Sequence, residues 1–126
     1  MEIISIEATD ETPRVHLDPN QHVLEFSGVS LPGDVTKFYD PILAWLETYK
    51  ASNPATTRTV FKMEYFNTAS SKMVMDILTI MEDLQAEGGN VTIDWFFKED
   101  DEDMEEAGEE FDDMVEVPFN LQSFEG

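Results

Sequence analysis

The sequence predicts a single α/β domain over residues 1–126, built on a mixed β-sheet with helices mainly on one face. Two segments, Phe61–Phe66 and Val91–Phe97, alternate apolar and polar residues with the period of a half-buried strand. The chain between them carries apolar residues at helical spacing, which indicates two central, parallel strands joined by a helical crossover. Charged residues at outward strand positions indicate that the second face of the sheet is partly open.

The residues before this unit predict a strand and then a hairpin. The strand is expected at Glu2–Glu7, and the hairpin pairs Pro13–Asp18 with His22–Gly28. Four apolar side chains of the hairpin would share its buried face: Val15, Leu17, Leu24 and Phe26. Neither His16 nor His22 has a neighbour at metal-ligand spacing, so both are interpreted as surface strand positions.

The first helix is predicted to begin after Asp34, a suitable N-cap, and to end at Ser52–Pro54. Pro41 lies inside this segment and predicts either a kink or a restart of the helix at Asp40. An apolar stripe at this spacing is more often core than ligand pocket. The stripe is largely aromatic and comprises Phe38, Tyr39, Ile42, Trp45, Leu46 and Tyr49.

The central helix follows directly after its strand, with Asn67 or Thr68 as the N-cap. At about 100° per residue, its apolar side chains fall on one arc, with Thr68 on the opposite, exposed arc. The apolar arc contains Met73, Val74, Ile77, Leu78, Ile80, Met81 and Leu84, and the exposed stripe contains Thr68, Lys72, Met75 and Thr79. On the preceding strand, Tyr65 is expected to share the buried face with Phe61 and Met63.

An amphipathic third helix is predicted over Glu99–Met114, after a glycine stop at Gly88–Gly89. It would dock through a thin apolar stripe, with Gly108 as a weak point. The stripe comprises Met104, Ala107, Phe111 and Met114 or Val115. Val115–Phe119 is expected to add a short edge strand before a frayed tail.

The chain is strongly acidic, with 7 basic and 28 acidic residues and a formal net charge of −21. Such a protein repels nucleic acid and anionic membranes, and basic protein surfaces attract it. The run from Glu99 to Glu116 has no basic residue, and a solvated helix face is the commoner interpretation of such a run. The absence of cysteine excludes disulfides and thiolate sites. No signal peptide or bilayer-spanning stretch is recognisable, so a cytoplasmic protein is expected.

No motif for catalysis or metal binding emerges from the spacing of the residues. There is no glycine-rich phosphate loop and no paired nucleophile and histidine. The acids of Glu99–Asp103 lack the central glycine and closing glutamate of a calcium loop. We therefore expect no enzymatic activity, no cofactor and no metal.

The hydroxyl residues at the start of the central helix are the remaining candidates for a functional site. A helix N-terminus favours a phosphate group, because its free N–H groups and its dipole point at the anion. Lys72 in this region opposes the helix dipole, and its simplest explanation is a pair with Asp76. The residues alone fit an ordinary helix cap as well as they fit a phosphorylation site.

One stretch resembles a known family. The run Tyr65–Leu78, YFNTASSKMVMDIL, resembles the motif of the SiaC family of bacterial regulatory phosphoproteins. The segment Pro41–Leu46 and the strand with Trp95 are also similar to that family, so the likeness covers essentially the whole chain. The strand, short hydroxyl turn and helix are more distantly similar to STAS-type anti-sigma-factor antagonists, which implies a STAS-like fold.

The resemblance implies a non-enzymatic switch without a cofactor. A cognate protein kinase would phosphorylate Thr68, and a metal-dependent serine/threonine phosphatase would remove the phosphate. The unphosphorylated form would bind and stimulate a diguanylate cyclase, in cyclic di-GMP signalling that controls biofilm formation. The surface expected to bind partners comprises Asn67, Ser71, Lys72, Met75, Asp76 and Thr79. The chain departs from the family in its acidic third helix and at Ala69, where many relatives have serine.

Two alternatives come from other functional classes. The first is an acidic nucleic-acid mimic that blocks a basic cleft through Glu99–Glu116, with binding that weakens steeply with salt and ignores Thr68. The second is a small-ligand or enzymatic domain that uses the aromatic cluster of the first helix. That alternative requires a deep pocket with convergent polar groups.

Overall fold

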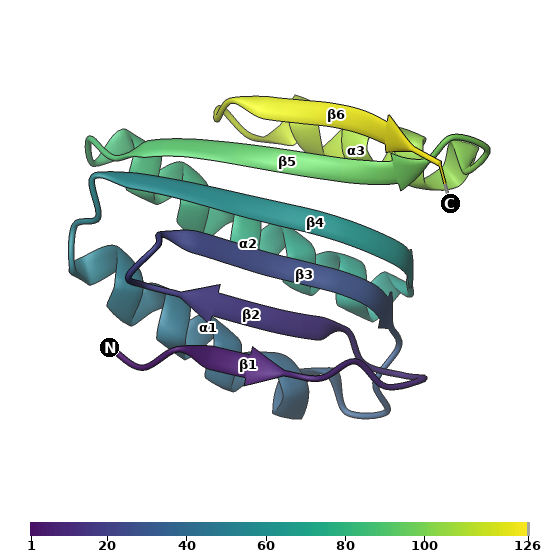
Figure 1. The fold of residues 1–126 in the computed structure, drawn as a ribbon, viewed down its shortest axis with the longest axis horizontal. Coiled ribbons are helices and arrows are strands. Elements are labelled where there is room, and N and C mark those ends of the chain that lie inside the picture. Colours follow the sequence, from purple (N-terminus) through teal and green to yellow (C-terminus); the bar gives the residue numbers. More distant parts are fainter. Residues whose placement is uncertain (126) are drawn as a thin grey trace.

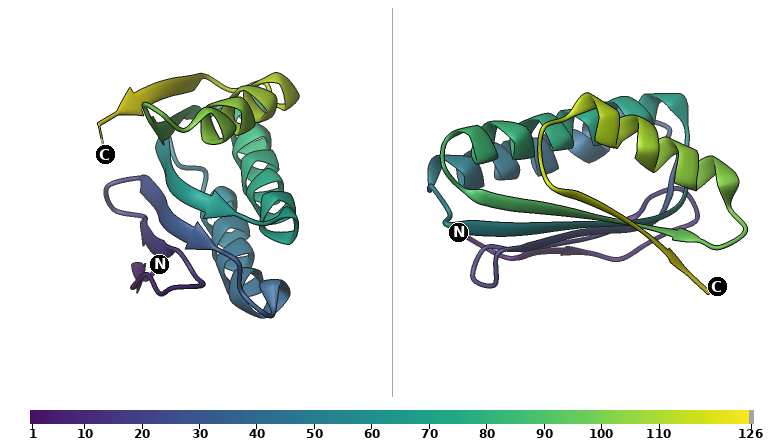
Figure 2. Two further views of the ribbon diagram at one scale, coloured as in Figure 1. Left: turned by 90° about the vertical axis from the view of Figure 1, so that its right-hand side faces the viewer. Right: turned by 90° about the horizontal axis from the view of Figure 1, so that it is seen from above.

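The computed structural model describes residues 1–125. Within that range lie, in chain order, β1 (Ile4–Ile6), β2 (Arg14–Asp18), β3 (Val23–Ser30), α1 (Val35–Ala51), β4 (Thr56–Phe66), α2 (Thr68–Ala86), β5 (Asn90–Lys98), α3 (Glu102–Met114) and β6 (Phe119–Phe124). The strands form one mixed sheet (Figure 1), and the helices cover one of its faces (Figure 2). The predicted fold class is therefore confirmed.

The strands lie in the sheet in the same order as in the chain. The β1–β2 and β2–β3 pairs are antiparallel, whereas β3, β4, β5 and β6 run parallel. Each helix therefore connects two neighbouring parallel strands. Connections of one hand that always advance in the same direction place their helices on the same face of a sheet. This topology leaves the opposite face uncovered. It confirms that the two strands predicted to be parallel neighbours, here β4 and β5, are so; β4 is central in the sheet, whereas β5 lies beside the edge strand β6.

The predicted hairpin is confirmed, and its four apolar side chains lie on the buried face as expected. Val15 lies opposite Phe26 and Leu17 opposite Leu24, and these side chains are buried. Its turn is held by Asp18, whose carboxylate accepts hydrogen bonds from two following backbone N–H groups. His22 lies in this turn with a φ of 58°, so its prediction as a strand residue is wrong. The imidazole turns inward, and its Nδ1 lies 3.1 Å from the hydroxyl of Tyr49.

A bulge in β4 changes which side chains of this strand are buried. Met63 pairs with Gly28, but Tyr65 pairs with the next residue, Val29, so β4 contains one residue more than its partner. An extra residue reverses the alternation beyond it. Phe66 therefore packs inward, and Tyr65 is 53% exposed. The prediction that Tyr65 is buried is wrong, because a bulge leaves no mark on the local pattern.

Helix α1 runs without interruption through Pro41. The predicted restart at Asp40 is therefore wrong. Pro41 lies on the exposed side of the helix, where its ring takes no space from the core. The predicted N-cap is confirmed, since the Asp34 side chain accepts a hydrogen bond from the N–H of Lys37.

Helix α3 docks through a close approach at Gly108. A Cβ atom at this position would lie 2.5 Å from the indole of Trp95, so only glycine lets the helix come this near to β5. Gly108 is thus a packing contact rather than the predicted weak point. Of the two residues left open for the end of the stripe, Val115 is buried and Met114 is 59% exposed.

The last strand lies further along the chain than predicted. Residues 115–118 form the connection after α3, and Phe119–Phe124 pair in parallel with β5. Pro118 cannot donate to a sheet ladder, which explains why the strand begins after it. The expected edge strand at Val115–Phe119 and the frayed tail are therefore corrected to one strand, β6.

Candidate functional site

The start of α2 lies at the edge of the sheet where the parallel strands end (Figure 1). Asn67 follows β4 directly and caps the helix, with its side-chain oxygen accepting a 2.9 Å hydrogen bond from the N–H of Ser70. Of the two predicted caps, Asn67 is therefore the one used. Thr68 is the first helical residue, and its side chain is exposed.

A buried chain of hydroxyl groups holds this turn in place. The Ser30 hydroxyl donates to Ser70 at 2.8 Å and lies 2.5 Å from the hydroxyl of Tyr39. Because Ser30 has one proton to give, Tyr39 donates to Ser30. The backbone N–H of Asn67 also donates to the carbonyl of Ser30, at 3.1 Å. The end of β3 and helix α1 thus fix the first turn of α2 on its buried side.

The three residues of this hydrogen-bonded chain, Ser30, Tyr39 and Ser70, are fully or almost fully buried. Burial raises the pKa of Tyr39, while the hydrogen bonds with Ser30 and Ser70 oppose that shift. The periodicity of α2 points Ser70 towards the core, but it does not reveal the partners. They lie 40 and 31 residues away in the sequence, and no local signal could have found them.

The polar face of α2 carries the residues expected to bind partners. Thr68, Lys72 and Thr79 are exposed, and Asn67, Ser71, Met75 and Asp76 are half-buried. Met75 packs partly against the core and is therefore less accessible than its place on the helical wheel indicates. The Thr79 hydroxyl donates to the carbonyl of Met75, which ties this part of the face to the helix backbone.

The electrostatics of the first turn of α2 favour an added anion. This turn contains no acidic side chain, so its free N–H groups and positive dipole end are not neutralised by a carboxylate. Lys72 forms no ion pair within residues 1–125, so the expected pair with Asp76 is not made. Its ammonium group remains in solvent, one turn from Thr68.

A hollow of about 360 Å³ lies between the end of β4 and the start of α3. Its lining includes the exposed ring of Tyr65 and the carboxylates of Glu64, Asp101 and Asp103. Tyr65 is a surface aromatic residue three positions before Thr68 that the sequence did not reveal. It adds an apolar, hydrogen-bonding contact to the surface at this edge of the sheet.

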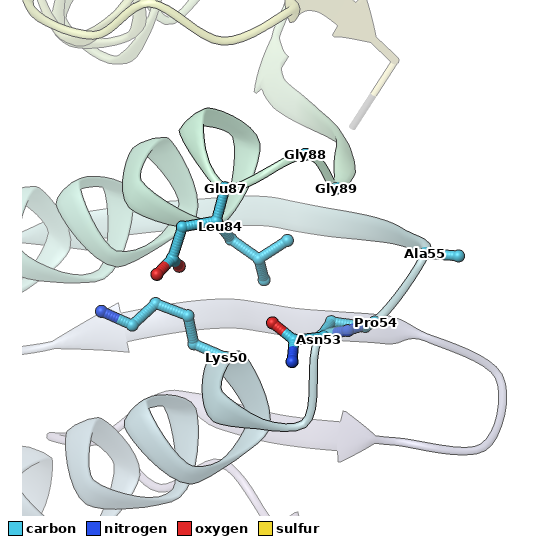
Figure 3. A pocket seen from close by; sticks show the side chains of 8 residues that line it. All are labelled: Lys50, Asn53, Pro54, Ala55, Leu84, Glu87, Gly88 and Gly89. Atoms are coloured by element: carbon cyan, nitrogen blue, oxygen red, sulfur yellow. The ribbon is translucent and has the colours of Figure 1, made fainter.

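A second hollow, of about 140 Å³, lies at the far end of α2 (Figure 3). It is lined by the last residues of α1 and α2 and by the turns that follow them. Lys50 reaches across this end to Asp83 at 3.7 Å and to Glu47 at 3.6 Å, and its charge suits the carboxyl end of α1. The length of α2 separates this hollow from Thr68 by roughly 28 Å.

The aromatic cluster of α1 belongs to the core rather than to a ligand pocket. Tyr39 and Tyr49 are buried, and Trp45 stacks on Tyr49 with ring centroids 5.3 Å apart. In the part of the chain that the structure describes, no cluster of histidine and acidic side chains is arranged to hold a metal ion. None of the helices between residues 1 and 125 combines the length and apolar character needed to cross a bilayer.

Comparison with known proteins identifies the family. A model of the SiaC family of regulatory phosphoproteins matches residues 6–124. The chain belongs to this family. The likeness inferred from the Tyr65–Leu78 run is thereby confirmed.

Solved structures of this family share the fold. Apo-SiaC from Pseudomonas aeruginosa is 28% identical, with a TM-score of 0.89 over 97% of this chain and 99% of that one. A second structure contains the diguanylate cyclase SiaD of the same organism in complex with its activator SiaC. That SiaC is 27% identical, with a TM-score of 0.92 over 96% of this chain and 99% of that one. An uncharacterized protein of Pseudomonas aeruginosa (strain UCBPP-PA14) is 28% identical over 98% of both chains.

Proposed function

We propose that this SiaC-family protein is a non-enzymatic switch that is reversibly phosphorylated on Thr68, and that its unphosphorylated form binds and activates a diguanylate cyclase. A cognate protein kinase adds the phosphate and a metal-dependent serine/threonine phosphatase removes it. The observation that carries the proposal is the exposed Thr68 at the first position of a capped helix whose first turn has no acidic side chain. The class of partner is carried over from the Pseudomonas aeruginosa SiaC that was solved as the activator of SiaD.

Thr68 can accept a phosphate without any unfolding, because its side chain is already exposed. The first-turn N–H groups and the ammonium of Lys72 favour the dianion in this position. The protein already carries a formal charge of −21, so about −1.5 to −2 further charges hardly change its overall field. The effect of phosphorylation must therefore be local.

The local effect acts on the polar face of α2. A phosphate on Thr68 would lie one helical turn from Lys72 and two turns from Met75, on the face where a partner has to bring apolar surface into contact. Removing a dianion from water against such a surface is costly, and the phosphate would also occupy Lys72. Met75 supplies an adaptable apolar contact in the unphosphorylated form. Asn67, Ser71, Asp76 and Thr79 form the rim of the same surface.

The test is a titration of the cyclase with four forms of the protein and one control variant. We expect unmodified protein and Thr68→Ala to bind equally and Thr68→Ala to resist inactivation by the kinase. Phosphorylated protein and Met75→Asp are expected to bind at least about tenfold more weakly. Met114→Asp is the matched control, because it places the same charge on an exposed methionine of α3.

Circular dichroism and urea unfolding of Met75→Asp separate lost binding from lost fold. If phosphorylated protein binds as tightly as Thr68→Ala, the proposed mechanism is wrong. If Met114→Asp weakens binding as much as Met75→Asp, the partner surface includes α3 and is not confined to α2. Binding that falls steeply with salt and is insensitive to Thr68 would instead favour the nucleic-acid mimic.

A further inference from the structure

The uncovered face of the sheet holds most of the positive charge of this acidic chain. Four of the seven basic side chains occupy outward positions on its strands: Arg14 on β2, Arg58 and Lys62 on β4, and Lys98 on β5. Arg58 is paired with Asp94 on the neighbouring strand. The other three line a hollow of about 310 Å³ near the carboxyl ends of the parallel strands.

The strand register places a hydroxyl group between two of these cations. Arg14 lies opposite Ser27, and Ser27 in turn lies opposite Lys62. All three line the hollow, together with Gly28 at the bulge between β3 and β4. Two cations flanking a hydrogen-bond donor are suited to a carboxylate or a phosphate.

The three basic side chains of the hollow differ in their ion pairs. Arg14 pairs with Glu25 at 3.2 Å, and Lys98 pairs at 3.7 Å with Glu64, a carboxylate that also lines the hollow. Lys62 makes no ion pair with a carboxylate of residues 1–125, and its ammonium lies 4.3 Å from the centre of the Phe124 ring. One positive charge thus remains over an aromatic surface.

The hollow also offers apolar surface. The ring of Phe124, the methyl group of Ala8 and the bare backbone of Gly28 contribute to its lining. Its volume lies at the lower end of the range for small-molecule sites, which are mostly apolar with a few placed polar groups. The combination fits a ligand with a single anionic group and an apolar body.

We propose that this hollow binds a small organic monoanion, a carboxylate whose apolar body lies against Phe124. The carboxylate meets the ammonium of Lys62 and the hydroxyl of Ser27, with Arg14 at the rim. The hollow lies on the face of the sheet opposite the helices and does not include Thr68, although Glu64 lines both this hollow and the one beside Tyr65. Two of its strands nevertheless lead to the turn before Thr68. Strand β3 ends at Ser30 and β4 is followed by Asn67, and the N–H of Asn67 donates to the carbonyl of Ser30.

The experiment uses octanoate as the probe, with 1-octanol and acetate as matched compounds. Octanol keeps the apolar body without the charge, and acetate keeps the charge without the body. We expect octanoate to shift the amide NMR signals of Ser27, Gly28, Lys62 and Phe124 in a saturable way. Each matched compound is expected to bind at least about tenfold more weakly.

Variants identify the anion contact. Lys62→Gln is expected to weaken octanoate binding about tenfold, because it removes the unpaired charge. Lys37→Gln, which removes an exposed lysine of α1, is expected to leave binding unchanged. Both lysines are exposed, so neither variant should disturb the fold.

The proposal is overturned if octanoate causes no saturable shift, or if Lys62→Gln and Lys37→Gln bind it equally. It is also overturned if octanol binds as well as octanoate, since the hollow would then attract only apolar chains. Equal binding of acetate would reduce the site to a simple anion contact and would contradict the role of Phe124. Phosphorylation is not required in any of these measurements, so failure here leaves the proposed switch untouched.

Discussion

Helices α2 and α3 begin in the same way and then differ. Each is capped by a short polar side chain, Asn67 for α2 and Asp101 for α3, that accepts a hydrogen bond from the N–H three residues on. The first turn of α3 then carries Glu102, Asp103 and Glu105, whereas the first turn of α2 carries no acid. The positive end of the α3 dipole is thus already neutralised, and that of α2 is free.

The two helices also differ in how they are held to the sheet. Helix α2 buries eight side chains along its length, whereas α3 buries two side chains and the backbone of Gly108. The phosphate that we propose on Thr68 would cost the fold little, because the start of α2 is held by burial and by the Ser30–Tyr39–Ser70 chain. The proposed switch position, Thr68, thus combines a free helix N-terminus with a rigid support beneath it. Of these two helices, α2 has both a first turn without acidic side chains and this support.

The largest change in stability is expected from a substitution that disturbs the docking of α3. Gly108→Val should destabilise the protein by about 3 kcal/mol, because the new side chain collides with the indole of Trp95. Urea unfolding measures the free energy. Gly33→Val is the control, since a Cβ atom at that position meets nothing within 4 Å. Equal stability of the two variants would mean that α3 does not rest on Trp95.

A smaller change in stability is expected from a substitution in the hydroxyl chain that supports the start of α2. Ser70→Ala should cost about 2 kcal/mol of unfolding free energy, because the buried hydroxyl of Ser30 loses its acceptor. Ser71→Ala, at the half-buried neighbouring position, should change stability by less than about 0.5 kcal/mol. A similar loss in both variants would show that the hydroxyl chain has no special part in holding the turn.

Hydrogen exchange compares the two helices directly. Amide hydrogens of Glu102–Met114 should exchange at least about tenfold faster than those of Ile77–Met81, because α3 is peripheral and rests on a thin apolar stripe. Mass spectrometry of the native protein measures both segments in one sample. Stronger protection of α3 would contradict its peripheral place.

The smallest effect concerns alkaline pH. The pKa of Tyr39 is raised above the ordinary value of 10.0, chiefly by burial, so the folded state holds this proton more tightly than the unfolded state. Its contribution to stability is therefore complete below pH 10.0 and is lost as the pH rises towards the folded-state pKa. Unfolding free energies measured on either side of that pH should fall less steeply for Tyr39→Phe. Some dependence should remain, because burial also raises the pKa of Tyr49.

The sequence by itself determined most elements of this protein. Alternation of apolar residues predicted the strands, and helical spacing predicted the buried arc of α2, from Met73 to Leu84, which the structure confirms. The cap at Asp34 and the glycine stop after α2 were also predictable. These features depend on residues a few positions apart, so local periodicity and backbone preference are enough to reveal them.

Only the tertiary structure decided the features that depend on contacts between distant segments. The exposure of Tyr65 follows from a bulge in the pairing of β4 with β3, and the need for glycine at position 108 follows from the indole of Trp95. The chain of Ser30, Tyr39 and Ser70 joins three separate elements, and the basic hollow joins side chains from neighbouring strands. Local sequence cannot specify such features, because strand register and helix docking are set by the packing of the whole core.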